Sequence, residues 1–118
     1  FSGRVMNADE LREGGLFNHV VPHDQLMTKA REIAKEIAEN TAPVSVALMR
    51  HMAWRSLGMD HPMEAHRWES RGITTRGKSP DAKEGVVSFK EKRLPNFPCT
   101  VSRDMPDYFP WWEEPKYS

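Results

Sequence analysis

The histidines are the first residues to consider for metal binding or acid–base chemistry. The chain contains five of them, at His19, His23, His51, His61 and His66. His19 and His23 are four residues apart, but Pro22 lies between them and disfavours the helix that would bring both rings onto one face. The five-residue separation of His61 and His66 is a poor ligand spacing. Without a cysteine pair or a helical HxxxH motif, these spacings predict no metal site and favour ordinary surface or core histidines.

Motifs for nucleophilic catalysis and for phosphate loops are also missing. No serine stands in a G-x-S-x-G context. Cys99 lies in a proline-rich segment, far from any helix start that would activate its thiol. Gly14 and Gly15 lack the following lysine of a phosphate loop and are better explained as the end of a helix. The chain therefore offers no candidate nucleophile.

Two pairs of glutamates could in principle act as an acid and a base. Glu10 and Glu13 form one pair, and Glu64 and Glu69 form the other. Carboxylates are common on solvated helix faces, and nothing in the sequence indicates that either pair lies in a dry pocket. We interpret both pairs as surface residues, so no catalytic residue is assigned.

A basic cluster near the end of the last predicted helix is the most specific chemical feature. Lys90, Lys92 and Arg93 follow Asp81 and Glu84, so the helix carries acid at its start and base at its end. Each such placement complements the helix dipole and contributes a few tenths to about 1 kcal/mol. Dipole complementarity is the simpler explanation, and phosphate binding is the more specific one.

The composition limits the classes of partner and compartment. The 118 residues carry formal net charge zero, which argues against nucleic acid held by bulk charge. A single cysteine excludes an internal disulfide and favours a reducing compartment, so we expect a cytoplasmic protein. No apolar run predicts a membrane span, and no signal peptide is recognised. Because the first residue is Phe1, we expect a fragment or a processed product.

Apolar periodicity and capping residues predict a mainly helical chain. One short helix follows Asn7, and the short apolar stretch at residues 17–21 predicts a brief strand or an extended segment. The longer predicted helices span residues 24–40, 43–57, 62–75 and 80 to about 93. The helix at 24–40 has a continuous apolar stripe, yet the chain supplies no sheet for it to cover, so we expect this stripe to pack against something outside these residues.

The last segment is rich in proline and aromatic residues. Residues 94–118 contain five prolines, which prevent a long helix. The aromatic residues are Phe97, Tyr108, Phe109, Trp111, Trp112 and Tyr117. We expect residues 98–118 to form an extended tail that lies against a surface, because buried rings remove a large apolar area from water.

Three segments, in order, are similar to the enoyl-CoA hydratase/isomerase (crotonase) superfamily. The most specific one is Asp81-Ala82-Lys83-Glu84-Gly85 with Phe89, Glu91-Lys92-Arg93, Pro95 and Phe97. The earlier two are Gly3-Arg4 with Ala8-Asp9-Glu10 and Gly15-Leu16-Phe17-Asn18-His19-Val20-Val21-Pro22, and the paired helices of residues 26–49. Leu11 and Phe17 depart from the usual pattern, where alanine and valine are common. We expect these bulkier residues to cause local repacking only.

The resemblance implies that residues 1–97 form the C-terminal helical region of the crotonase (ClpP/crotonase-like, α/β) fold, contributing to subunit packing and CoA contact. The complete protein would be a lyase of the enoyl-CoA hydratase/isomerase family acting on acyl-CoA thioesters, as in fatty acid metabolism. Family members stabilise an enolate with two backbone N–H groups, which lie with the catalytic carboxylates in the N-terminal half. Since none of these groups is present, we expect the 118-residue chain alone to be inactive.

The resemblance also implies two substrate contacts and a set of partners. Phe89 matches a position that can line the acyl pocket, and Lys92 matches a lysine that can reach the CoA phosphates or adenine. The expected partners are the acyl-CoA substrate, the N-terminal half of the same enzyme, and further copies in a trimer or hexamer. No cofactor is expected, because CoA is part of the substrate, and no nucleic acid or membrane partner is expected.

A non-enzymatic function is the main alternative. The apolar stripes could belong to a free-standing helical association module that binds a partner or itself. A DNA-binding helical domain is a weaker alternative, because it would need a basic face.

Overall fold

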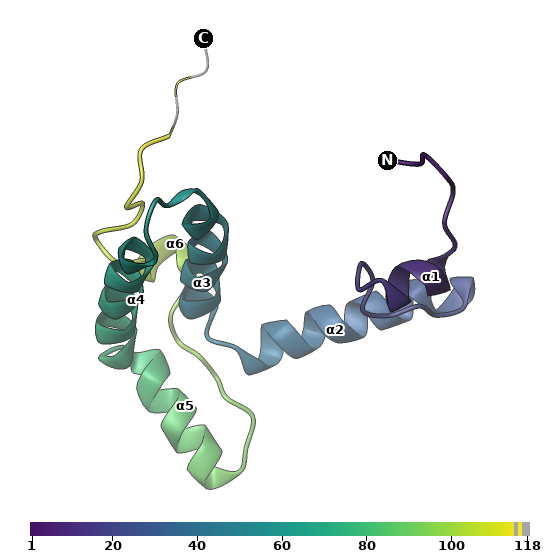
Figure 1. The fold of residues 1–118 in the computed structure, drawn as a ribbon. Helices are drawn as coiled ribbons and strands as arrows, with labels where there is room; N and C mark the ends of the chain where they lie inside the picture. Colours follow the sequence, from purple (N-terminus) through teal and green to yellow (C-terminus); the bar gives the residue numbers. More distant parts are fainter. Residues whose placement is uncertain (115, 117–118) are drawn as a thin grey trace. The chain divides into compact units, whose positions relative to one another are not determined.

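A computed structural model describes residues 1–114 and 116 of the chain (Figure 1). The described residues are mainly helical and contain no strand. They belong to two compact units, Phe1–Glu36 and Ile37–Ser118. Helix α2 (Leu26–Asn40) runs from the first unit into the second.

The first unit begins with helix α1 (Ala8–Glu13). The side chain of Asn7 accepts a hydrogen bond from the backbone N–H of the third helical residue at 2.9 Å, so the predicted N-cap is confirmed. The helix ends where Gly15 takes φ of 80°, a left-handed conformation that glycine adopts without steric cost. The N–H of Leu16 then donates to the carbonyl of Leu11 at 2.9 Å, which completes a Schellman turn.

The predicted strand at residues 17–21 is wrong. These residues are irregular and lead into a short 3-10 turn, η1 (His23–Gln25), before α2 begins. A strand needs a neighbouring strand to pair its N–H and C=O groups, and the described residues provide none. The apolar character of the segment therefore indicates that its side chains can be buried, but it does not predict hydrogen bonding to another strand.

The second unit contains three helices that each begin with proline, which suits the first helical turn because its missing N–H is not needed there. These helices are α3 (Pro43–Arg55), followed by η2 (Ser56–Gly58), then α4 (Pro62–Gly77) and α5 (Pro80–Glu91). Helices α3 and α4 lie side by side, and α5 follows α4 after a short turn (Figure 1).

Helix α4 continues two residues beyond the predicted end at Thr75, despite Gly72 in its interior. The hydroxyls of Thr74 and Thr75 donate to the carbonyls of Ser70 and Arg71, at 2.8 and 2.9 Å. These bonds satisfy the threonine hydroxyls within the helix, so the two residues do not end it.

The buried core of the second unit is small. Val44 and Leu48, one turn apart on α3, are buried together with Cys99. Met105, Phe109 and Trp111 from the following segment pack against them. The core of this unit therefore depends on residues that follow α5.

The segment from residue 98 onward is not uniformly extended. Its described residues form one helical turn, α6 (Val101–Asp104), and are otherwise irregular. Its described aromatic residues pack on α3 and α4, which confirms that it lies against a surface. Pro115 and Tyr117 lie outside the described residues.

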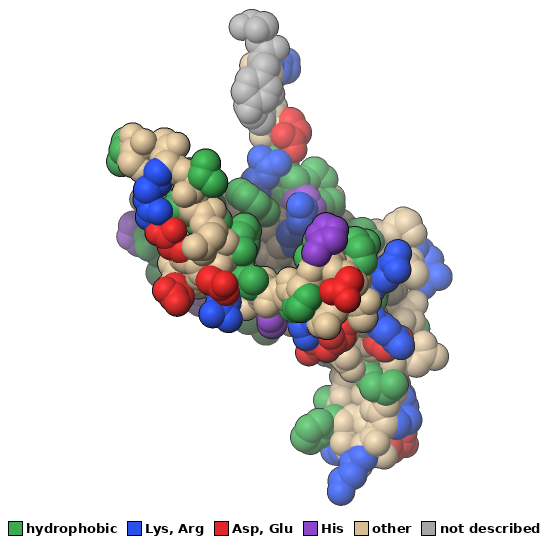
Figure 2. All heavy atoms as spheres, turned by 90° about the vertical axis from the view of Figure 1, so that its right-hand side faces the viewer, with side chains coloured by type: hydrophobic (Ala, Val, Ile, Leu, Met, Phe, Trp, Pro, Cys, Tyr) green, Lys and Arg blue, Asp and Glu red, His purple; other side chains and the backbone are tan. Residues whose placement is uncertain are grey.

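Large apolar side chains remain at the surface of both units. No residue in the range 1–36 is buried, and Leu26 and Ile37 on the predicted stripe of α2 are each about half exposed. Apolar side chains lie openly among charged ones in the space-filling view (Figure 2). The stripe is thus present but has no covering within the described chain.

Candidate functional site

Helix α5 positions the two residues that the sequence assigns to substrate binding. Its start is held by Ser79, whose hydroxyl accepts the backbone N–H of Ala82 at 3.3 Å, with Pro80 at the first helical position. Ser79 is therefore the N-cap of this helix, a position for which serine and a following proline are well suited.

One side of α5 faces the segment that follows it and carries two carboxylates. Asp81, only 2% exposed, accepts the backbone N–H of Cys99 at 3.0 Å. Glu84, one turn later, accepts the backbone N–H of Asn96 at 2.7 Å. The three-residue spacing of the carboxylates on the helix thus matches the three-residue spacing of the N–H groups in the returning chain. Both carboxylates fix this segment, in addition to lying near the positive end of the helix dipole.

Asp81 also forms an ion pair that is mostly withdrawn from water. Its second oxygen lies 3.3 Å from a terminal nitrogen of Arg76 on α4. The other terminal nitrogen of Arg76 donates to the carbonyl of Asp104 at 3.3 Å. This network links α4, α5 and α6.

Arg93 is occupied within the chain. Its guanidinium donates two hydrogen bonds to the carboxylate of Glu84, at 2.6 and 3.0 Å, and one to Glu91 at 2.6 Å. The bonds from Arg93, and next the N–H of Asn96, lower the pKa of Glu84 to about 2. Glu84 and Glu91 in turn raise the pKa of Arg93 above its ordinary value. Of the predicted basic cluster, Arg93 is therefore a structural residue.

Lys92 has an unusual backbone for a lysine. Its φ of 54° and ψ of 40° place it in the left-handed region. Among the described residues, no other residue except glycine has a positive φ. Its N–H donates to the carbonyl of Phe89 at 3.3 Å, and the N–H of Arg93 donates to the carbonyl of Ser88 at 3.1 Å. This is a Schellman turn with lysine at the position that usually holds glycine.

The opposite side of α5 faces away from the rest of its unit. Phe89 is 85% exposed, and Val86 and Leu94 are also exposed. Lys90 and Lys92 are exposed, and their ammonium groups form no hydrogen bond or ion pair with the described residues. Basic and apolar side chains lie side by side where α5 ends, at the bottom of Figure 2. The predicted contacts Phe89 and Lys92 thus lie three residues apart at one accessible helix end.

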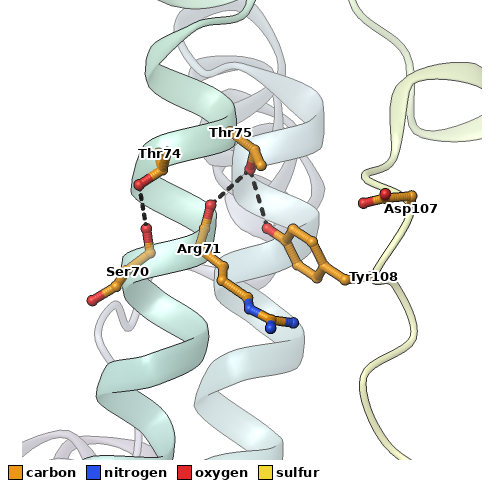
Figure 3. Close-up of a pocket in the computed structure, with 6 residues that line it drawn as sticks. All are labelled: Ser70, Arg71, Thr74, Thr75, Asp107 and Tyr108. Atoms are coloured by element: carbon orange, nitrogen blue, oxygen red, sulfur yellow. Dashed lines mark hydrogen bonds between the residues drawn. The ribbon is translucent and has the colours of Figure 1, made fainter.

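A shallow hollow of about 570 Å³ lies elsewhere, between α4 and the tail (Figure 3). Its residues are Ser70, Arg71, Thr74, Thr75, Asp107 and Tyr108. The hydroxyl of Thr75 lies 3.2 Å from that of Tyr108, and both threonine hydroxyls bond to helix carbonyls. No acid–base or nucleophile–base pair faces this hollow, so we interpret it as part of the tail's docking surface.

Two further hollows lie in the second unit. One, of about 470 Å³, is lined mainly by apolar residues of α3 and α4, including Met49, Met52 and Ile73. The other, of about 350 Å³, lies beside residues 94–97. Neither contains Phe89 or Lys92.

His51 has a packing role that the sequence did not predict. Its ring stacks on Trp112, with centroids 5.0 Å apart, and meets Phe109 at 5.1 Å. Arg55, one turn further along α3, lies 4.2 Å above the Trp112 ring and 2.7 Å from Glu114. Tail and helix are joined here by stacking and cation–π contacts. The four-residue spacing of His51 and Arg55 predicts that they share one face of a helix. Nothing in the sequence indicated that Trp112, Phe109 and Glu114 would pack against that face.

The other candidate groups have local structural roles or stand alone. His61 caps α4 by accepting the N–H of Met63 at 3.0 Å, and Glu10 pairs with Arg4. Across residues 1–114 and 116, His, Cys, Asp and Glu side chains nowhere gather in a group of three that could hold a metal ion. Within the same residues, no helix combines the length and apolar character needed to cross a bilayer.

The chain is similar to known proteins over most of its length. Residues 1–99 match the family model described as enoyl-CoA hydratase/isomerase. The enoyl-CoA hydratase ACTT3 of Alternaria alternata is 43% identical over 88 residues, which cover 74% of this chain and 29% of that protein. The enoyl-CoA hydratase EchA19 of Mycobacterium tuberculosis is 38% identical over 96 residues, covering 81% of this chain and 35% of that protein. The chain therefore spans about a third of the length of these relatives.

A solved structure agrees with these sequence matches. The probable enoyl-CoA hydratase/isomerase from Mycobacterium abscessus superposes with a TM-score of 0.78 at 28% identity. The superposition covers 84% of this chain and 40% of that one. Because the family model matches well over half of the chain, the chain belongs to the enoyl-CoA hydratase/isomerase (crotonase) family.

Proposed function

We propose that residues 1–97 are the C-terminal helical region of an enoyl-CoA hydratase/isomerase that acts on acyl-CoA thioesters, and that residues 98–118 are an extension. The match of residues 1–99 to the family model is the observation that carries this proposal. The order of the three motifs, which ends in the Asp81–Phe97 segment, supports the C-terminal position.

In this proposal, the outer side of α5 contacts the substrate. Lys92 binds a phosphate or the adenine of CoA, and Phe89 lines the acyl pocket. The lysine carries a compact charge on a flexible stem, which suits an anionic phosphate. Two observations support these roles: Phe89 is 85% exposed, and the exposed ammonium group of Lys92 has no ion-pair or hydrogen-bond partner among the described residues.

The uncovered apolar surfaces are proposed to pack against the remainder of the enzyme and against further subunits of a trimer or hexamer. The exposed stripe of α2, with Leu26 and Ile37, supports this role. An apolar surface of this kind is favoured only when something covers it. No cofactor is proposed beyond the CoA of the substrate. The proposed location is the cytoplasm, supported by the single cysteine.

The reaction proposed for the complete protein is of the lyase type, an addition of water to an enoyl-CoA or a related isomerisation. The family's backbone oxyanion donors and catalytic carboxylates are not assigned to any residue of this chain. Such groups contribute many powers of ten to rate. The isolated chain is therefore expected to show no turnover.

Substitution of Lys92 in the complete enzyme tests the proposed contact. Lys92→Ala should raise the dissociation constant for CoA roughly 10-fold, as expected for one charge-assisted hydrogen bond. Lys90→Ala is the matched control, because it removes an equally exposed cation two residues away. Equal effects of the two substitutions would mean that only net charge matters, and no effect of Lys92→Ala would exclude the contact.

A free-standing association module is the second candidate, and the uncovered stripe of α2 also fits that function. Enoyl-CoA hydration measured on the native polypeptide, with crotonyl-CoA as substrate, distinguishes the two. Turnover favours the enzyme. A native polypeptide that binds no CoA and assembles through its helices favours the module.

A further inference from the structure

The left-handed backbone of Lys92 must be held by its surroundings, because a residue with a β-carbon disfavours this conformation. The two hydrogen bonds of the Schellman turn contribute, but such turns usually contain glycine. The side chain of Lys92 is exposed and forms no hydrogen bond or ion pair with the described residues. The restraint must therefore come from the residues on either side.

Glu84 and Arg93 supply that restraint. The two side chains form a two-pronged ion pair, with Arg93 nitrogens 2.6 and 3.0 Å from the Glu84 oxygens. The same carboxylate accepts the N–H of Asn96 at 2.7 Å. Glu84 thus ties the helix interior to residues on the far side of Lys92, and a planar pair of this kind fixes direction as well as distance.

Arg93 is also bonded to Glu91 at 2.6 Å and to the carbonyl of Leu94 at 3.0 Å. Its position next to Lys92 along the chain means that motion of Arg93 would move the turn. Release of Arg93 would in addition add its unpaired charge to those of Lys90 and Lys92 beside the proposed phosphate contact.

We propose that Glu84 is a positioning residue for the CoA contact: through Arg93 and the N–H of Asn96 it holds the turn that aims Lys92 at the substrate. This inference rests on the proposed function. It assigns to Glu84 a role in substrate binding without contact to the substrate.

Removing a negative charge in one variant and a positive charge in another distinguishes a positioning role from a simple electrostatic effect on CoA binding. Glu84→Gln and Arg93→Gln in the complete enzyme should both raise the dissociation constant for CoA, each by about 3- to 10-fold. Electrostatics alone predicts opposite effects, because Glu84→Gln adds positive charge and Arg93→Gln removes it. The double variant should bind CoA no more weakly than either single variant, because the two residues act as a unit.

Two exposed residues whose side chains form no hydrogen bond or ion pair with the described residues are the matched controls. Glu64→Gln on α4 and Arg50→Gln on α3 make the same charge changes away from α5 and should leave CoA binding unchanged. In Glu84→Gln the Michaelis constant for the acyl-CoA should rise while kcat stays within about 2-fold. A merely unstable variant would instead lose active enzyme, and hence apparent kcat.

Hydrogen exchange provides a readout that does not depend on CoA. Glu84→Gln should speed exchange in a peptide covering residues 92–97, and Glu64→Gln should not. Tighter CoA binding by Glu84→Gln, or unchanged binding and exchange, would overturn the inference while leaving the role of Lys92 intact. If Lys92→Ala itself leaves binding unchanged, the proposed CoA contact fails and the positioning role fails with it.

Discussion

Replacing Lys92 by glycine should stabilise the protein and weaken its binding of CoA at the same time. The residue has φ of 54°, and its exposed side chain forms no hydrogen bond or ion pair with the described residues that would be lost. For a residue with a β-carbon, the left-handed conformation costs roughly 1–2 kcal/mol. Glycine avoids this cost, but it lowers the free energy of unfolding by roughly 0.5–1 kcal/mol because it gives the unfolded chain more conformational freedom.

The net gain expected for Lys92→Gly is about 0.5–1 kcal/mol of unfolding free energy. In the complete enzyme this corresponds to a rise of a few degrees in melting temperature. Thermal denaturation followed by circular dichroism measures the gain, and titration calorimetry with CoA measures the loss of affinity.

Lys92→Ala is the control that separates the two effects. Alanine removes the ammonium group but keeps the β-carbon, so it should weaken CoA binding equally without the gain in stability. Equal melting temperatures for the glycine and alanine variants would refute the backbone argument. A glycine variant that binds CoA as well as the parent would refute the functional one. If both effects appear, the chain retains an unfavourable residue at this turn because its side chain is used.

Three other predictions concern the contacts between α5 and the residues that pack against it. Asp81→Ala should lower the free energy of unfolding by about 3 kcal/mol, measured by urea denaturation, because it removes the carboxylate partner of Arg76 and the acceptor of the Cys99 N–H; Asp60→Ala at an exposed site should change it little. Gly85→Ala should raise the free energy of unfolding by roughly 0.5–1 kcal/mol, because an added β-carbon would lie at ordinary contact distance, 3.8 Å from the Phe97 ring, and alanine is the better helix former; a loss in the same measurement would show that the contact is tighter than the structure indicates. The pKa of Glu84 is lowered from 4.5 to about 2, so its stabilising contribution is complete above pH 4.5 and is lost as the pH falls toward 2; the stability difference between the parent and Glu84→Gln, followed by circular dichroism, should therefore shrink across that range, and a constant difference would contradict the assignment.

The helices of this chain could be predicted from sequence because their signals are local. Asn7, Pro43 and Ser79 mark helix starts through bonds or backbone angles that involve only the next few residues. The resemblance to the crotonase family was likewise visible in short ordered motifs, and the family match confirms it.

The roles of charged residues depended on contacts between segments that are distant in sequence. Asp81 and Glu84 were recognisable as complements to a helix dipole, but their bonds to Cys99 and Asn96 exist only because the chain returns along α5. For the same reason, Arg93 could not be distinguished from its neighbours in the basic cluster until Glu84 was found beside it.

The sequence by itself determined where helices begin, which faces are apolar and to which family the chain belongs. Only the tertiary structure decided that residues 17–21 form no strand, that His51 stacks with the tail, and that Lys92 stands in a left-handed turn. The physical reason is the range of the interactions. Caps and helical periodicity act within a turn or two, whereas ladders, ion pairs and ring stacking require partners that folding brings from elsewhere in the chain.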